Sequence, residues 1–316
     1  MRALLRTLAL ACMLGMAGLA AQAQPANMPS EAAEAELMRQ LTGRASIPNP
    51  QAATLIQPAG RDWQDFHNRT LAWVGGVAVL GVIGALAMFF FSRGRIRIEG
   101  GPSGQTIQRF NILERANHWM VASTFIILGL SGLNLTFGRH LLLPLIGPEA
   151  FTAVSQWGKY AHNFLSFPFT LGLLVMFFIW VKDNIPNARD ITWFKLGGGL
   201  IGKGHPEAAR FNGGQKVVFW ITILGGGAVA ASGYFLIFPF VGTDIAGMQL
   251  SHIIHSLLSV LMIAAMLAHI YIGSIGMEGA IDAMGSGQVD LKWAREHHSL
   301  WVEEEMSKTP QGAKHV

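Results

Sequence analysis

The sequence is short of charge and of cysteine, and both shortages restrict what the protein can be. Only 13% of its 316 residues are charged, about half the share usual for soluble proteins, while 51% are hydrophobic. Its one cysteine, Cys12, lies in a stretch that we expect to be removed. This excludes disulfides, cysteine-held iron–sulfur clusters, covalent CxxCH haem and thiol catalysis in the mature chain. The formal charge of +4 is too small and too scattered to suggest nucleic-acid binding.

The first 23 residues have the parts of a secretory signal. Arg2 and Arg6 form a basic start, a short apolar core follows, and residues 21–23 read Ala-Gln-Ala, an A-x-A cleavage site. An uncleaved membrane helix is the alternative interpretation. Residues 24–68 are polar and rich in Ala, Pro and Gln, and we expect a loosely structured segment outside the cytoplasm.

Five windows without any Asp, Glu, Lys or Arg follow, each long enough to cross about 30 Å of hydrocarbon as a helix. The windows are residues 71–91, 116–137, 161–181, 217–240 and 250–275. The predicted fold is therefore all-α, an integral membrane bundle of five transmembrane helices. A cleaved signal places the mature N-terminus outside the cytoplasm, and five crossings then place the C-terminus inside.

The basic residues agree with this orientation, because Lys and Arg gather on the cytoplasmic side of membrane proteins. The segments predicted inside carry 15 Lys and Arg, and those predicted outside carry 6. The inside segments are 92–115, 182–216 and 278–316, and the outside ones are 24–70, 138–160 and 241–249.

Histidine is the only acidic or basic side chain within the windows. The five are His118, His162, His252, His255 and His269. Ionisable groups inside membranes are costly and usually functional. The lack of carboxylates argues against a proton pump and suits a buried metal or haem held by nitrogen. A lone histidine there is often only a hydrogen-bonded core residue, but several at matched depths indicate ligands.

The depths of four histidines match in pairs. His118 begins the second span at the inner face, and His162 begins the third at the outer face. His255 and His269 are 14 residues apart in the fifth span, a rise of about 21 Å, and project from nearly one face. Depth thus pairs His162 with His255 outside and His118 with His269 inside. Each pair can hold one b-type haem, and two imidazoles leave no open position for oxygen, which indicates electron transfer.

His252 competes with His255 for the outer site, since it lies three residues earlier near the same face. Its spacing from His269 implies about 26 Å, which moves it towards the headgroups, so we favour His255. The remaining histidines fall outside the spans and are expected to be solvated. They are His67, His140, His205, His297, His298 and His315.

Residues 105–305 resemble the cytochrome b (gamma) subunit of respiratory formate dehydrogenases, a branch shared with nickel–iron hydrogenase cytochromes b. The matching pieces are 109–119 (RFNILERANHW), 183–186 (DNIP), 190–193 (DITW), 211–216 (FNGGQK), the helix with His255 and His269, and 293–301 (WAREHHSLW). The resemblance implies haem ligands at His118, His162, His255 and His269. It also implies a quinone pocket near the inner haem, formed by Asn212, Gly214, Gln215 and His269.

The turn at 212–216 has two interpretations. Asn212 and Gln215 can donate to a quinone carbonyl, and the helix-terminal amides can join them. Taken alone, the turn is more typical of a plain cap with Asn212 as N-cap. With the resemblance we interpret it as the quinone site, and Lys216 as a marker of the inner membrane face.

The expected domains run from a signal peptide (1–23) and a periplasmic segment (24–68) through an extra transmembrane helix (69–92). A four-helix dihaem domain (105–278) and a cytoplasmic tail (279–316) follow. We expect a protein of the bacterial inner membrane, in contact with lipid, that carries two haems b and reduces menaquinone or ubiquinone near the cytoplasmic face. The resemblance implies an iron–sulfur subunit and a molybdenum or tungsten catalytic subunit as partners. The alternatives are the anchor of a nickel–iron hydrogenase or other periplasmic oxidoreductase, and a haem-free channel or scaffold.

The topology can be tested with fusions to the C-terminus. A cytoplasmic C-terminus should give an inactive alkaline phosphatase fusion and a bright fluorescent protein fusion, because alkaline phosphatase needs the oxidising periplasm. N-terminal sequencing should find Gln24 first. An active phosphatase fusion would mean that the number of spans is wrong.

Overall fold

A computed structural model describes residues 63–199 and 204–308. The predicted signal peptide and nearly all of 24–68 lie outside the described residues. In chain order the elements are η1 (Phe66–Leu71), α5 (Ala72–Arg93), β1 (Thr106–Gln108), α6 (Ile112–Leu141), α7 (Leu143–Trp180), η2 (Lys182–Asn184), α8 (Ala188–Lys195), η3 (Gly197–Gly199), α9 (Gly213–Trp220), η4 (Ile221–Gly225), α10 (Gly226–Ile237), α11 (Ile245–Tyr271), η5 (Ile272–Gly276), α12 (Asp282–Gly285), β2 (Gln288–Asp290), α13 (Leu291–His297) and α14 (Ser299–Lys308).

Five helices in the described residues are long and apolar enough to cross a membrane, which confirms the predicted fold class. They are Trp63–Arg93, Ile112–Leu141, Leu143–Trp180, Gly213–Ile237 and Ile245–Gly276. Three contain a π-helical stretch, namely η1, η4 and η5, a distortion that is frequent at functional sites. The third helix is longer than its apolar window, since it starts before Gly147. A left-handed backbone at Gly147 (φ 78°) and the following Pro148 bend the helix near this start.

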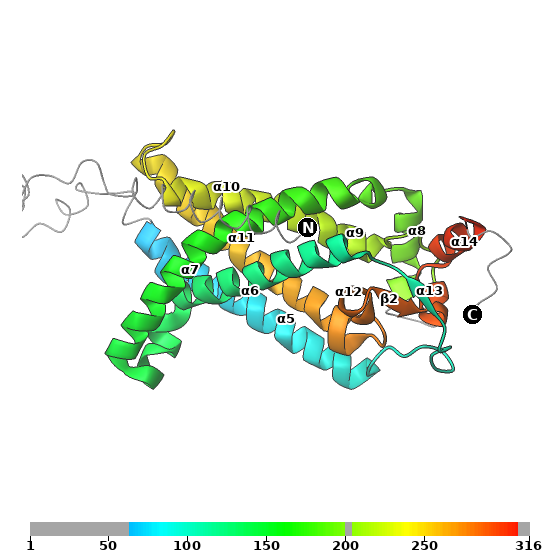
Figure 1. Cartoon of the computed structure of the whole chain (residues 1–316). Helices are drawn as coiled ribbons and strands as arrows, with labels where there is room; N and C mark the ends of the chain where they lie inside the picture. Colours follow the sequence, from blue (N-terminus) through cyan, green and yellow to red (C-terminus); the bar gives the residue numbers. More distant parts are fainter. Residues whose placement is uncertain (1–62, 200–203, 309–316) are drawn as a thin grey trace, which may run out of the picture. The chain divides into compact units, whose positions relative to one another are not determined.

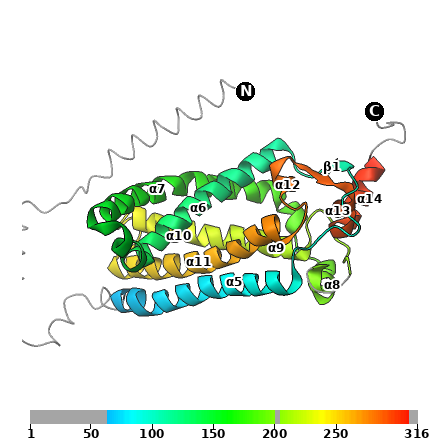
Figure 2. The same ribbon diagram turned by 90° about the horizontal axis from the view of Figure 1, so that it is seen from below.

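Helix α11 lies between the other membrane helices. It packs against α10, α5 and α6, while α6 and α7 form an antiparallel pair that reaches α10. Figure 1 shows α11 between α10 and α5, and Figure 2 shows α5 running alongside α11. The extra helix therefore covers the helix that carries two of the predicted haem ligands.

Helices α6 and α7 approach closely beside His118. A Cβ atom on Gly172 would lie 2.5 Å from Cγ2 of Val121, so only glycine fits there. The Asn117 amide donates to the Gly172 carbonyl at 3.1 Å across the same contact. Small residues allow such approach in membranes, where lipid is as apolar as any side chain.

A buried carboxylate anchors the start of α6. Glu114 is 3% exposed and closes the capping box with Asn111. It accepts hydrogen bonds from Arg210 at 2.6 Å and from the Trp180 indole at 2.7 Å, and Arg210 also pairs with Asp183 at 2.9 Å. These bonds join the ends of α6 and α7 to the segment before α9 and fix the helical turn that leads to His118.

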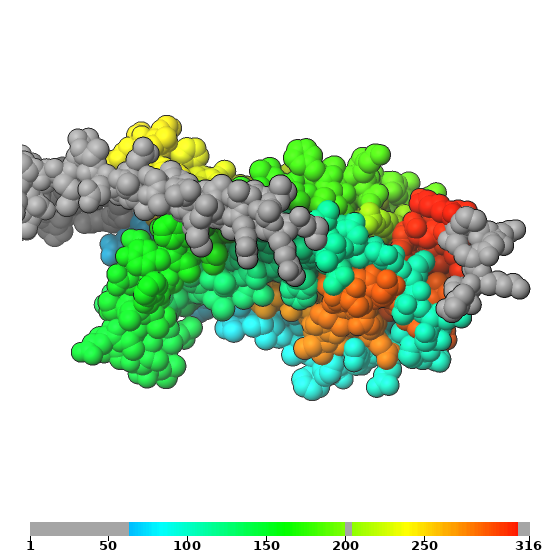
Figure 3. Space-filling model, viewed as in Figure 1, coloured from blue at the N-terminus to red at the C-terminus, as the bar shows by residue number. Residues whose placement is uncertain are grey.

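The segments after η5 fold into a cap together with the chain before α6. Strands β1 and β2 pair antiparallel, with Ile107 opposite Val289. Helices α12, α13 and α14 complete the cap, and Figure 3 shows the segment around α12 lying against the chain that precedes α6. Residues 279–308 of the expected tail are thus folded.

The prediction that His297 and His298 are solvated is wrong, because the cap buries both. His298 is 0% exposed and His297 is 9% exposed. His298 Nδ1 donates to the Ala209 carbonyl at 2.9 Å, and its Nε2 accepts from the buried Arg109 at 3.0 Å. Arg109 also lies over the Trp301 ring at 4.9 Å, so aromatic rings and a neutral imidazole compensate its burial.

Trp63 already belongs to the first membrane helix, although the sequence predicts a loosely structured segment over residues 24–68. The Trp63 ring lies 4.8 Å from the ring of His252 on α11, and Leu71 is fully buried. This packing extends the helix beyond its apolar window, a contact that hydropathy does not register.

The cap should lose stability in mild acid. Burial, helped by His205 and Arg109, lowers the pKa of His297 from its ordinary 6.5 to about 4, and burial also lowers the pKa of His298 well below 6.5. Because the unfolded histidines gain protons first, stability is complete above pH 6.5 and falls as the pH drops towards 4, by up to about 3 kcal/mol for His297. Hydrogen-exchange protection of residues 288–308 measures this loss. His297→Gln should flatten the pH dependence, whereas an unchanged slope, or an equal change in the exposed His140→Gln, would contradict it.

Candidate functional site

The structure brings four predicted ligands together in two pairs. The ring centroids of His118 and His269 are 6.3 Å apart, and those of His162 and His255 are 5.9 Å apart. Helices α6, α7 and α11 supply these side chains. The pairs are those that depth predicts, while their role as haem ligands stays a prediction.

The spacing within each pair suits a metal ion between the rings. Metal–imidazole bonds of about 2.0–2.1 Å place two coordinating rings roughly 6 Å apart, centroid to centroid. Glycines lie beside the outer rings: a Cβ on Gly233 would be 3.0 Å from Cε1 of His255, and one on Gly132 would be 3.6 Å from Cε1 of His162. The absence of side chains there leaves the imidazoles room, and the residues present therefore fit a bis-imidazole haem.

Hydrogen bonds orient both outer imidazoles. His255 Nδ1 bonds the Val229 carbonyl at 2.9 Å, so this nitrogen carries the proton. His162 Nδ1 lies 2.8 Å from the Ser131 hydroxyl, which donates its own proton to the Ile127 carbonyl at 2.7 Å and thus accepts from the imidazole. Both rings keep the lone pair of Nε2 free for iron, the arrangement usual for ligating histidines.

The inner pair is less restrained by protein groups. His118 Nδ1 is buried without a hydrogen-bond partner in the described residues. The ring of His269 has no hydrogen-bond partner in the described residues either, but it is exposed, and only the His118 nitrogen is buried. Buried polar nitrogens normally have a partner, and a coordinated metal would supply one.

His252 packs against Trp63 and is not part of either histidine pair. Its ring stacks on Trp63, which also contacts His67 at 5.3 Å. All three residues lie at the end of the bundle nearer His255, on η1 with its preceding turn and on α11. This packing gives His252 a structural role and favours His255 as the ligand.

The turn before α9 forms the cap that its sequence allows. Asn212 Oδ1 accepts from the Gln215 backbone amide at 2.9 Å, and Gln215 Oε1 accepts from the Asn212 amide at 3.1 Å. Gly214 lies against Trp193, because a Cβ there would be 2.9 Å from the indole. Both side-chain oxygens are therefore engaged in capping, whereas the side-chain NH2 groups stay available to a ligand.

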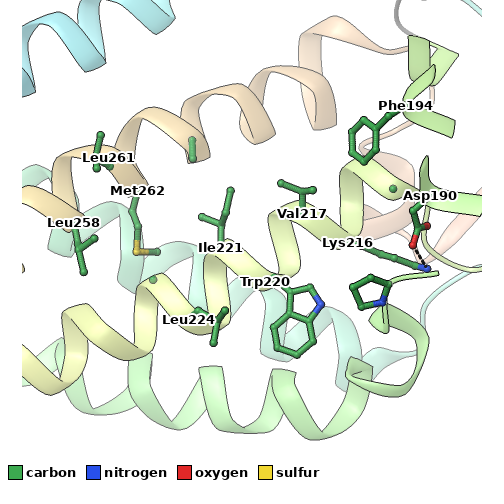
Figure 4. A pocket seen from close by; sticks show the side chains of 14 residues that line it. Asp190, Phe194, Lys216, Val217, Trp220, Ile221, Leu224, Leu258, Leu261 and Met262 are labelled. Carbon is green, nitrogen blue, oxygen red and sulfur yellow. Dashed lines mark hydrogen bonds and ion pairs between the residues drawn. The ribbon is translucent and has the colours of Figure 1, made fainter. Parts of the chain in front are cut away.

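An apolar groove of about 580 Å³ runs between the α9–η4 segment and α11, and Figure 4 shows its lining. Lys216 and Asp190 lie at one end and form an ion pair at 3.0 Å. Both are largely buried, with Lys216 5% exposed. Sequence reasoning missed this pair, although a lysine at the edge of an apolar window was a visible signal. Lys216 points into the groove rather than out to the headgroups.

Comparisons with known proteins point to one family. The model of the family described as prokaryotic cytochrome b561 matches residues 109–287. The cytochrome b556(fdo) subunit of formate dehydrogenase from Escherichia coli K12 is 30% identical over 213 residues, 66% of this chain and 98% of the relative. The cytochrome b556(Fdn) subunit of the nitrate-inducible enzyme is 30% identical over 63% of this chain and 91% of its own length. The formate dehydrogenase cytochrome b556 subunit of Haemophilus influenzae is 26% identical over 61% and 80%.

Removal of the Ser131 hydroxyl should weaken the outer site more than removal of the Ser232 hydroxyl. Ser131 is the hydrogen-bond partner of His162 Nδ1, whereas His255 keeps the Val229 carbonyl when Ser232, at 3.4 Å, is lost. Partners of this kind are worth about 10–100-fold in metal affinity. We expect Ser131→Ala to lose its outer haem to apomyoglobin at least about tenfold faster than wild type. Equal loss from both serine variants would contradict this ranking.

Proposed function

The chain belongs to the prokaryotic cytochrome b561 family, and on that premise we propose that it is the dihaem cytochrome b subunit of a formate dehydrogenase. It carries electrons from a periplasmic iron–sulfur subunit across the membrane to quinone. The observation that supports this proposal is the pair of imidazole couples, 6.3 and 5.9 Å between ring centroids, at two positions of α11 that are 14 residues apart. Membership in a cytochrome b family itself implies haem b.

Two haems would be held by His118 with His269 and by His162 with His255. Haem iron with two imidazole ligands has no open position, so the group supplies one-electron transfer. The protein orients Nε2 of His162 and His255 through the Ser131 hydroxyl and the Val229 carbonyl. The 14 residues between His255 and His269 set the sites about 21 Å apart along α11.

The direction of transfer follows from the orientation. With the cap on the cytoplasmic side, as the 15-to-6 distribution of basic residues favours, His162 and His255 are the outer pair. Quinone then takes electrons near the inner pair and protons from the cytoplasm, so turnover generates a membrane potential. Asn212, Gly214, Gln215 and His269 form the quinone end in this proposal.

The described residues offer no iron–sulfur or molybdenum ligand set, so formate is oxidised by partner subunits. The sequence relatives carry formate dehydrogenase in their names and are matched over 98% and 91% of their lengths. We therefore assign an iron–sulfur subunit and a molybdenum or tungsten catalytic subunit as the partners. The outer end of the bundle is where the iron–sulfur subunit docks.

The proposal is tested on the purified native complex. We expect two low-spin haems b per chain, because two imidazole pairs are available. His162→Ala or His255→Ala should remove one haem, and His118→Ala or His269→Ala the other. Haem quantification with a reduced-minus-oxidised spectrum measures this, and mass spectrometry of the complex identifies the large subunit. One haem per chain, loss in His252→Ala instead of His255→Ala, or a hydrogenase large subunit would each contradict the assignment.

A further inference from the structure

We propose that the groove beside α9 binds the quinone of the proposed function, and that Lys216 donates a hydrogen bond to one quinone carbonyl. This inference rests on the proposed function and adds Lys216 and the apolar groove to its quinone end. It places the quinone ring at the Lys216 end of the groove and the isoprenoid tail along the apolar remainder. The capping turn at Asn212 then supports this end of the groove.

The groove leads towards the inner histidine pair. Leu258, Met262 and Ala265 line it from α11. These residues follow one another at spacings of four and three, so they share one helical face, and His269 continues that face four residues after Ala265. A ring that lies in this groove therefore approaches the helix turn that carries His269.

Lys216 lies at the same depth as His269. Gly225 is level with Met262, because a Cβ on the glycine would be 3.2 Å from the methionine sulfur. Lys216 is nine residues from Gly225 towards the inner end, and the antiparallel α11 reaches Tyr271 over the same number. Both paths rise about 14 Å, and His269 lies about 3 Å short of that level. The backbone of Lys216 and that of His269 thus lie within about 3 Å of one depth.

Lys216 has a donor to spare. An ammonium group carries three N–H donors. One bonds the Ile185 carbonyl at 3.1 Å and another bonds Asp190 Oδ2 at 3.0 Å. The third has no acceptor among the described residues, although the side chain is buried. A charged group inside a membrane protein is normally paired with an opposite charge or with backbone carbonyls, or it serves a function.

The charges favour a neutral ligand. Lys216 and Asp190 form an ion pair at 3.0 Å and together carry no net charge, so a phosphate headgroup at Lys216 would also meet a carboxylate. A quinone carbonyl accepts the free N–H without that repulsion. The rest of the lining, including Phe194, Val217 and Ile221, is apolar and suits a ring and a tail (Figure 4). The volume of about 580 Å³ is typical of a small-molecule site.

The test compares groove variants in the whole complex with ubiquinone-2 and menaquinone-2 as probes. After reduction of the haems, their reoxidation is followed over a range of quinone concentrations, and quinone retained through purification is measured by mass spectrometry. Lys216→Met should raise the half-saturating quinone concentration about tenfold or more, since a hydrogen bond from a charged donor is lost. Lys216→Arg should recover part of the affinity. Haem content and haem spectra should not change.

Two control pairs separate ligand binding from structural damage. Ala265→Phe fills the groove and should lower quinone retention, while Ala87→Phe places the same bulk on an exposed position of α5 and should not. Asn187→Ala removes the side-chain cap of α8 outside the groove and should leave the half-saturation unchanged. An increase in Asn187→Ala equal to that in Lys216→Met would make Lys216 a structural residue and overturn the proposal.

The remaining outcomes distinguish a failure of the proposed function from a failure of the groove assignment. If wild-type haems are not reoxidised by either quinone, the proposed function itself fails. If wild type is reoxidised and both Lys216→Met and Ala265→Phe match it, the function stands and the groove assignment is wrong. If Ala265→Phe loses phospholipid and keeps its quinone, the groove is a lipid site and the assignment is again wrong.

Discussion

The arrangement depends on one continuous helix. Helix α11 holds His255 and His269 on nearly one face, and the fixed rise of an α-helix sets the distance between them. The other membrane helices supply the groups that meet this face or pack against α11. Helix α6 brings His118, α7 brings His162, α10 brings the Val229 carbonyl, and α5 covers α11 from another side. A change in the path of α11 would alter both sites together.

Close packing within the bundle relies on glycines, which have no side chain, rather than on large apolar side chains. Gly172 lets α6 meet α7 at Val121, and Gly233 leaves room for the His255 ring. In a membrane, burial of apolar surface between helices gains little, because lipid tails are equally apolar. Dispersion contacts at short range and hydrogen bonds such as Asn117 to the Gly172 carbonyl therefore hold the bundle together.

Outside the membrane spans, the cap uses buried polar groups in a different way. Arg109 is 3% exposed, and its pKa falls to about 9 because burial and the nearby Arg210 disfavour its charge. The fully buried His298 accepts a hydrogen bond from it, which requires the imidazole to be neutral. Glu114 and Arg210 tie this cap to the first turn of α6. The end of the bundle that carries His118 and His269 is thus braced by a polar network.

The sequence alone was enough for the five spans, the family and the depths of the histidines, because hydropathy is local and helical rise is constant. Residue counting by itself therefore pairs His118 with His269 and His162 with His255. Tertiary structure decided which groups meet across distant segments. Nothing local pairs Ser131 with His162, joins His298 to the Ala209 carbonyl 89 positions away, or sets Asp190 against Lys216, 26 positions along the chain. Those contacts arise only when separate helices pack, and they determine which nitrogen is free and where a ligand can lie.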